Sequence, residues 1–115
     1  MVKSSRRRHT PLDGPQLAAV ADLFAVLSEP SRLRILQFLQ GGPATVSQIM
    51  KATGLKQANA SKQLGILHQA GVLAREKDGN VVNYSIRLPL VFDLCALVCT
   101  GLREEAHHRL QQLKG

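Results

Sequence analysis

The polar side chains best placed for chemistry lie between Thr45 and Gly71, in a segment whose pattern indicates two helices. Apolar residues recur at helical spacing on both sides of the pair Gly54-Leu55, which predicts a short helix, a glycine turn and a second amphipathic helix. This order of elements is the helix-turn-helix pattern. The expected inward residues are Val46, Ile49 and Met50 in the first helix, and Ala60, Leu64 and Leu67 in the second.

The outward face of the second helix has the chemistry of a DNA-reading surface. Placing the apolar residues inward on a 100° wheel turns outward a set of small, amide-bearing or cationic residues. They are Ala58, Lys62, Gly65 and Gln69, flanked by Asn59, Ser61 and Ile66. In the major groove, Asn and Gln pair with adenine edges, and Lys pairs with guanine or phosphate. The alternative is an ordinary solvated helix, which would more often mix Glu with Lys.

The distribution of charge supports a nucleic-acid partner. The chain has 115 residues, a net charge of +7 and a pI of about 10.1, so nucleic acid is the first partner to consider. No Asp or Glu occurs between Pro30 and Arg75. The six basic residues of this window are Arg32, Arg34, Lys51, Lys56, Lys62 and Arg75. With one Tyr, three Phe and no Trp, the chain lacks the stacking platforms of single-strand binders, which favours a duplex.

The composition predicts one domain preceded by a basic arm. We expect residues 1–15 to form a flexible arm, which either tracks phosphates or raises solubility, and residues 16–115 to form the folded domain. Two cysteines do not make a secreted disulfide framework, and no signal peptide is apparent. The most apolar window, Leu88–Leu102, contains Asp93 and is too short to span a bilayer. A soluble, cytoplasmic protein with no membrane association is expected.

The flanking segments predict two further helices and a hairpin before the last helix. A helix opens near Leu17 and runs to Leu27, and a second covers residues 31–40, with Pro30 in its first turn. Its expected inward residues are Leu33, Leu36 and Leu39, with Ile35 and Phe38 widening the apolar face. Residues 73–77 and 81–87 flank Asp78-Gly79-Asn80, a β-hairpin signal. This hairpin either serves as a wing that reaches DNA or closes the core.

Together these segments resemble a known family. The runs SEPSRLRILQFL and VSQIMKATGLKQANASKQLGILHQAGVLAREKDGNVVNYSI look like the ArsR family of winged-helix bacterial repressors. The similarity covers Leu17–Leu102 and depends on the ordered set of motifs rather than on any one of them. It implies a mainly α fold (α+β) of about five helices plus a two-stranded wing. It also implies a homodimer that binds an operator palindrome and dissociates when a ligand arrives, often a metal or an oxidant.

From these patterns we predict the residues that contact double-stranded DNA. They are Lys56, Gln57, Ala58, Asn59, Ser61, Lys62 and Gln63 from the recognition helix, and Arg75, Lys77 and Asn80 from the hairpin.

The last helix, expected over residues 90–113, is apolar around most of its circumference. Its apolar residues are Leu90, Val91, Leu94, Cys95, Leu97, Val98, Cys99 and Leu102. A small domain cannot easily cover both sides of such a helix, so a partner is expected, although burial within one subunit is the alternative. The resemblance implies that the first and last helices pair across the two-fold axis of a homodimer.

The metal sites that the family uses are not matched in this sequence. Thr45 and Ser47 stand where a thiolate site needs Cys, and Leu88, Leu90 and Gly101 stand where a second site needs Asp or His, leaving only Glu104 compatible. Leu and Gly side chains have no lone pair to donate, so no metal site is predicted at either place. His107 and His108 with Glu104 are a further candidate, but adjacent histidines point apart on a helix, and a solvated face is favoured.

Cys95 and Cys99 remain as candidate sensor residues. At i and i+4 their Cβ atoms lie roughly 5–6 Å apart, whereas a disulfide needs about 3.5–4.5 Å. They could hold a thiophilic metalloid such as arsenite or pair across a dimer. The apolar neighbours favour the other interpretation, that they are inert small core residues. No cofactor is required by any motif, and the identity of an inducer stays open.

An enzyme is the competing class and lacks support. The sequence contains no Gly-rich phosphate loop, no nucleophile elbow and no HExxH, so no catalytic residue is predicted. The favoured function is a homodimeric repressor that a small inducer releases from its operator. The alternatives are a winged-helix adaptor that binds protein, or a constitutive DNA-binding regulator without a ligand. Duplex binding that weakens steeply with salt separates DNA binding from the adaptor.

Overall fold

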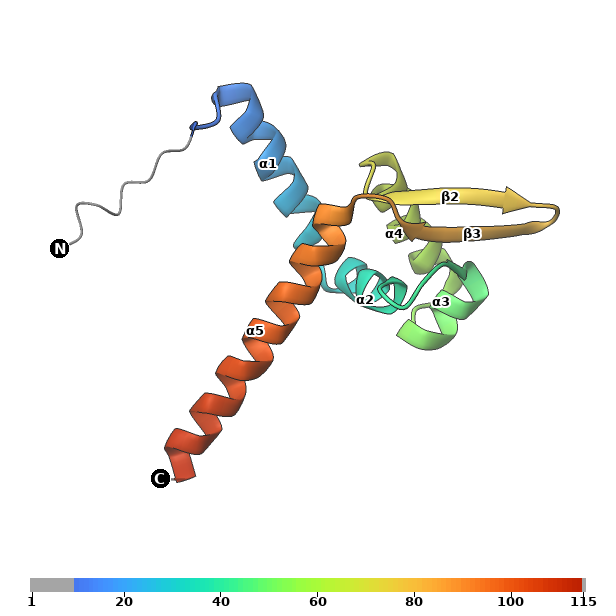
Figure 1. The fold of residues 1–115 in the computed structure, drawn as a ribbon. Helices are drawn as coiled ribbons and strands as arrows, with labels where there is room; N and C mark the ends of the chain where they lie inside the picture. The colour runs from blue at the N-terminus through green and yellow to red at the C-terminus, as the bar shows by residue number, and fades with distance from the viewer. Residues whose placement is uncertain (1–9, 115) are drawn as a thin grey trace.

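The fold is a winged helix-turn-helix domain with a long C-terminal helix. The structure, a computed structural model, describes residues 10–114, and over this range it contains five α-helices and one three-stranded antiparallel sheet (Figure 1). The elements are α1 (Gly14–Leu27), α2 (Pro30–Leu39), β1 (Ala44–Thr45), α3 (Val46–Thr53), α4 (Gln57–Gln69), β2 (Leu73–Asp78), β3 (Val81–Ile86) and α5 (Pro89–Lys114). The predicted fold class is confirmed, with a third strand that was not expected.

The first helix begins earlier than the apolar spacing indicated. Asp13 caps α1, because its side chain accepts a hydrogen bond from the Gln16 amide while the Gln16 side chain accepts one from the Asp13 amide. This reciprocal pair satisfies two N–H groups at the helix end, so the helix starts at Gly14 rather than near Leu17. Gly14 and Pro15, assigned to the basic arm, therefore belong to α1. The basic residues of that arm lie outside the described residues.

The second helix buries three of the five apolar residues that were expected on its inward face. Glu29 caps α2 by accepting a hydrogen bond from the Arg32 amide at 3.0 Å, and Pro30 occupies the first turn as predicted. Ile35, Leu36 and Leu39 are buried, whereas Leu33, expected inward, is 44% exposed. Phe38, also expected inward, is 38% exposed. Leu33 instead borders an open groove that α2 shares with α1 and α5, whereas Ile35, Leu36 and Leu39 join the core. Adjacent residues Ile35 and Leu36 therefore both meet the core.

The break between the two helices of the motif depends on a glycine. Gly54 ends α3 with φ of 78°, and its amide donates to the Met50 carbonyl at 2.8 Å. This left-handed conformation strains residues that carry a Cβ but not glycine. At the other end of α3, Thr45 and Gln48 form a second reciprocal cap. The helix-turn-helix is thus bounded by a cap, a glycine turn and the start of α4 at Gln57.

The wing is an antiparallel hairpin whose loop is one residue shorter than predicted. Asp78 pairs with Val81 in the ladder, which leaves Gly79-Asn80 as a two-residue loop. Gly79 has φ of 66°, and the positive value at the first loop position is the pattern of a type II′ turn. The short strand β1 pairs with β3 and widens the sheet to the order β1-β3-β2.

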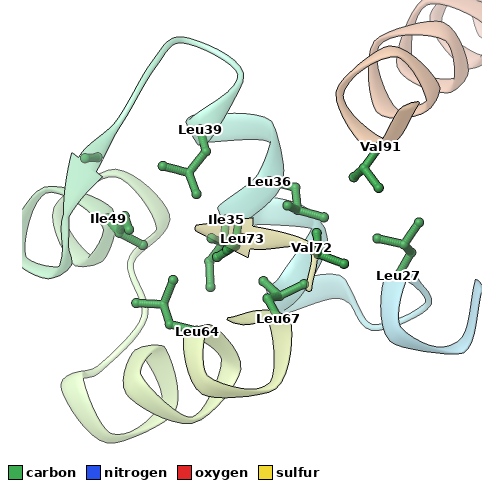
Figure 2. Close-up of a cluster of buried hydrophobic side chains, with 11 residues drawn as sticks. Leu27, Ile35, Leu36, Leu39, Ile49, Leu64, Leu67, Val72, Leu73 and Val91 are labelled. Atoms are coloured by element: carbon green, nitrogen blue, oxygen red, sulfur yellow. The ribbon is translucent and has the colours of Figure 1, made fainter. Parts of the chain in front are cut away.

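A single apolar core joins all of the helices and the root of the wing (Figure 2). Leu64 and Leu67 of α4 are fully buried against Ile35 and Leu36 of α2 and Ile49 of α3. Val72 and Leu73 extend the cluster to the wing, and Leu27 and Val91 extend it to α1 and α5. The orientation of α4 about its own axis is therefore determined by the side chains that it buries.

Much of α1 and α5 lies away from this core. Figure 1 shows α5 projecting from the rest of the molecule, on the side opposite the wing tip. Large apolar side chains on both helices are exposed: Leu17, Val20 and Phe24 on α1, and Leu90, Phe92, Leu97, Val98, Leu102, Leu110 and Leu113 on α5. Between residues 10 and 114, no helix is long and apolar enough to cross a bilayer.

Candidate nucleic-acid interface

The outer face of α4 is exposed over its whole length. The three predicted inward residues, Ala60, Leu64 and Leu67, are completely buried. Of the predicted outward residues, Ala58, Asn59, Ser61, Lys62, Gly65 and Gln69 are exposed, and Ile66 is half-buried. Lys56 and Gln57 at the helix start are exposed as well. The amphipathic division of this helix is confirmed by the burial of its residues.

The outer face of α4 carries no acidic side chain and includes several small residues. Neither α3 nor α4 contains an acidic residue, whereas Lys51, Lys56 and Lys62 are exposed on or beside them. A Cβ added at Gly65 would meet no other atom within 4 Å, so the position opens directly to solvent. Small residues at Ala58, Ser61 and Gly65 let a bulky ligand approach the helix backbone, and the lysines provide cations for an anionic one.

Gln63 does not belong to this face. It is 6% exposed, and both ends of its amide are hydrogen-bonded inside the protomer. Its Oε1 accepts from Nη1 of Arg32 at 2.8 Å, and its Nε2 donates to Oδ1 of Asn59 at 2.9 Å. The prediction that Gln63 reaches a ligand is therefore not supported. Helical spacing could have indicated that Gln63 faces inward. It lies three residues after Ala60 and next to Leu64, both of which are inward residues.

Arg32, one of the six basic residues of the acid-free window, is also engaged within the protomer. It is half-buried, and its Nε donates to the Val26 carbonyl near the end of α1 at 2.6 Å. Together with the bond to Gln63, this guanidinium links α1, α2 and α4. Every fully buried side-chain nitrogen or oxygen in the described part of the chain has a hydrogen-bond partner. Arg32 and Gln63 are thus internal supports of α4.

The wing separates its charges by strand alternation. Successive residues of a strand point to opposite faces, so Arg75 and Lys77 share one face of β2 while Glu76 and Asp78 share the other. Nε of Arg75 donates to the Tyr84 hydroxyl at 3.2 Å, across the strand pair. Arg75, Lys77 and Asn80, the three predicted wing residues, are exposed. The cationic face of the wing is therefore not neutralised by its own acids.

A second feature is an apolar groove of about 510 Å³ between α1, α2 and α5. Its walls include Phe24 and Leu27 of α1, Leu33 of α2, and Leu94, Val98 and Leu102 of α5. The thiols of Cys95 and Cys99, both half-buried and free, also line it. Burial raises the pKa of the Cys95 thiol, and the charge of Cys99 raises that pKa further. A raised pKa keeps this thiol protonated at neutral pH, which slows reactions that need the thiolate.

The structure offers no preformed metal site within residues 10–114. No three His, Cys, Asp or Glu side chains of this range lie close enough together to hold an ion. Glu104, His107 and His108 are all exposed on α5. Thr45, at the position where the family's thiolate site needs Cys, accepts a hydrogen bond from the Gln48 amide as a helix cap. Its side chain therefore has a structural use.

Comparison with known proteins agrees with this architecture. The family model for bacterial regulatory proteins of the arsR family matches residues 29–75, from the cap of α2 to the third residue of β2. The HTH-type transcriptional regulator Rv0081 of Mycobacterium tuberculosis is 40% identical over 78 residues, which cover 67% of this chain and 68% of Rv0081. This chain belongs to the arsR family.

Solved structures of relatives have the same fold. The antimony-specific transcriptional repressor AntR superposes with a TM-score of 0.80 at 30% identity, over 94% of this chain and 97% of AntR. The homodimeric winged helix-turn-helix DNA-binding domain of Mb0332 from Mycobacterium bovis superposes with a TM-score of 0.77 at 30% identity, over 87% and 93% of the two chains. This arsR-family chain therefore has the fold and relatives of DNA-binding transcriptional repressors, and not those of an enzyme.

The raised pKa of the Cys95 thiol can be tested by its rate of alkylation. Because alkylation requires the thiolate, iodoacetamide should modify Cys95 in the folded protein more slowly than in the urea-unfolded chain. The folded rate should continue to rise with pH after the unfolded rate has levelled off. Site-resolved mass spectrometry over a pH series measures both rates. Identical pH profiles in the two states would contradict the burial of this thiol.

Proposed function

We propose that this protein is a homodimeric repressor that docks the α4 of each protomer in the major groove of a palindromic operator. The observation that carries the proposal is the exposed face of α4, which combines small, amide and cationic residues with a complete lack of carboxylates. A major groove about 12 Å wide admits a helix of this kind. Lys56, Gln57, Ala58, Asn59, Ser61 and Lys62 are the residues that we assign to the operator from this helix.

The wing supplies the second part of the proposed contact. Arg75 and Lys77 lie on one face of β2, and Asn80 lies at the tip of the hairpin. Cations at this position can neutralise phosphates beside the half-site, which adds affinity without reading sequence. The bond from Arg75 to the Tyr84 hydroxyl holds its side chain along the sheet. The base-reading helix and the phosphate-binding hairpin thus have separate tasks.

The proposed dimer forms through α1 and α5. Phe24 is 54% exposed, Leu97 is 71% exposed and Leu102 is 65% exposed, and such apolar surface is stabilised when it leaves water. The relative Mb0332 is homodimeric, which supports the same assembly here. A two-fold axis sets the two α4 helices about 34 Å apart on one side of the duplex, so the operator must be palindromic. A bound dimer represses by blocking polymerase access.

Replacing Lys62 tests the contact of α4 with DNA. Lys62→Ala should weaken duplex binding, and it should lower the slope of log K against log[salt] by about one unit if the ammonium contacts a phosphate. Fluorescence anisotropy over a salt series measures the slope. Arg103→Ala, which removes an exposed cation from α5, is the control and should leave the slope unchanged. An unchanged slope for Lys62→Ala excludes that role, and a wild type without duplex affinity at low salt would indicate an adaptor.

A charge placed on α5 tests the dimer. Leu97→Glu should shift the protein from dimer to monomer, because a carboxylate would have to leave water in an apolar interface. Operator affinity should fall with it, since one protomer contacts one half-site. Light scattering coupled to gel filtration measures the mass. Asn80→Asp lies in the loop that joins β2 to β3, and Figure 1 shows the tip of this hairpin and α5 on opposite sides of the molecule. This variant should leave the mass unchanged, and a dimeric Leu97→Glu protein would contradict the interface.

A second function, release by a thiophilic metalloid, is favoured by the position of the two thiols. Cys95 and Cys99 line the groove that α1 and α5 border, so an adduct there would alter the surface that we assign to the dimer. The relative AntR is an antimony-specific repressor. The Cβ atoms of cysteines at i and i+4 lie roughly 5–6 Å apart, so we infer that the two sulfurs can share one ion. Each sulfur would lose its proton as antimonite loses a hydroxide, and the products are water and an Sb–S bond.

The thiol hypothesis predicts a specific loss of response. Antimonite should release the wild-type protein from its operator, whereas the Cys95→Ser, Cys99→Ser double variant should remain bound, because serine hydroxyls are poor ligands for a soft ion. Gel-shift titration with antimonite measures the release. Equal responses of the two proteins would end the thiol hypothesis and leave a repressor whose inducer binds elsewhere.

A further inference from the structure

Three side chains form a continuous series of hydrogen bonds from the interior of the protomer to the surface of the recognition helix. Arg32 of α2 donates through Nη1 to Oε1 of Gln63, and Gln63 donates through Nε2 to Oδ1 of Asn59. Arg32 is half-buried, Gln63 is 6% exposed, and Asn59 is exposed on the first turns of α4. This series of hydrogen bonds therefore begins at a guanidinium engaged within the protomer and ends at an exposed amide on α4.

The direction of these hydrogen bonds follows from the chemistry of their first member. A guanidinium has five N–H donors and no acceptor, so Gln63 must turn its carbonyl oxygen towards Arg32. The NH₂ group of Gln63 then faces Asn59. Two NH₂ groups cannot pair, so Asn59 must offer its oxygen to Gln63, and its own nitrogen Nδ2 is left for an external partner. One donor-only group thereby orients both amides.

We propose that Arg32 and Gln63 are positioning residues that determine operator specificity by presenting Asn59 to the base edges as a hydrogen-bond donor. This inference rests on the proposed docking of α4 in the major groove. Without Arg32, both amides could rotate together and leave Oδ1 of Asn59 outward instead. With Arg32 in place, Asn59 selects a base edge that carries an acceptor, such as N7 and O6 of guanine, rather than the N4 donor of cytosine.

The part-buried bond of Arg32 to the Val26 carbonyl stabilises this orientation. Nε of Arg32 donates to that carbonyl at 2.6 Å, so the guanidinium is held at two of its edges. Rotating it away would leave the buried oxygen of Gln63 without a partner, which is costly in a site closed to water. The donor character of Asn59 is therefore built into the folded protomer before DNA arrives.

The test reverses the direction of the hydrogen bond between residue 63 and Asn59 with a side chain of the same shape as glutamine. In Gln63→Glu, one carboxylate oxygen accepts from Arg32 and the other can accept from Nδ2 of Asn59, so Asn59 must turn its oxygen outward. Arg32→Lys keeps a cation that only donates hydrogen bonds. Arg32→Gln introduces an amide that can either donate or accept one. Gln112→Glu adds the same charge at an exposed site on α5 and serves as the charge control.

The measurement is base preference, which is a ratio of affinities and is independent of the fraction of protein that is folded. The wild-type dimer first selects a duplex from a randomised library, and every base pair of that duplex is then exchanged in turn. Asn59→Ala identifies the contacted position as the one where the preference disappears. There, Gln63→Glu should reverse the wild-type preference by at least about tenfold, which corresponds to about 1.4 kcal/mol.

The remaining variants complete the test. Arg32→Lys and Gln112→Glu should keep the wild-type preference, and Arg32→Gln should relax it. A 7-deazapurine at the contacted position should weaken wild-type binding if N7 is the acceptor, and should have no effect on Gln63→Glu. The inference is overturned if Gln63→Glu keeps the wild-type preference, or if Asn59→Ala weakens all duplexes equally, as a phosphate contact would. A wild type that selects no sequence would instead refute the proposed docking itself.

Discussion

The burial of one face of α4 is the constraint on which the rest of the arrangement depends. Ala60, Leu64 and Leu67 are completely inaccessible, and a rotation of the helix would expose apolar surface to water on one side while burying Lys62 on the other. Both changes are unfavourable. The core of this small domain therefore does more than stabilise the fold, because it also determines which polar side chains α4 can present.

Polar contacts add a second constraint that apolar packing cannot supply. Burial sets the rotation of α4, but a hydrophobic contact does not distinguish the oxygen of an amide from its nitrogen. The bonds from Arg32 to the Val26 carbonyl and to Gln63 make that distinction. They also join α1 to the recognition helix, so the end of the proposed dimerisation helix and the proposed DNA-binding surface share one guanidinium.

The exposed apolar faces of α1 and α5 show the limit of a domain of this size. The core is complete without most of α5, where Val91 is the one fully buried residue between positions 89 and 113. Leu94, Cys95 and Val98 instead line an open groove with Phe24. In the proposed dimer, the same groove provides the area that holds two protomers together and contains the two thiols, so assembly and a chemical signal would act on a common surface.

The sequence by itself determined the features that depend on short-range pattern. The 3.6-residue period located the inward face of α4, the glycines located the break at Gly54 and the turn at Gly79, and the charge pattern identified an acid-free surface. Only the tertiary structure decided the features that depend on distant partners. Helical spacing places Gln63 near the inward face, but only the fold brings Arg32, 31 residues away in the chain, to its amide oxygen. Leu33 is exposed because it borders the open groove between α1, α2 and α5. The two-residue strand β1 exists only through its pairing with β3. Periodicity reports which side of an element is apolar, but it has no information about which distant group will meet that side.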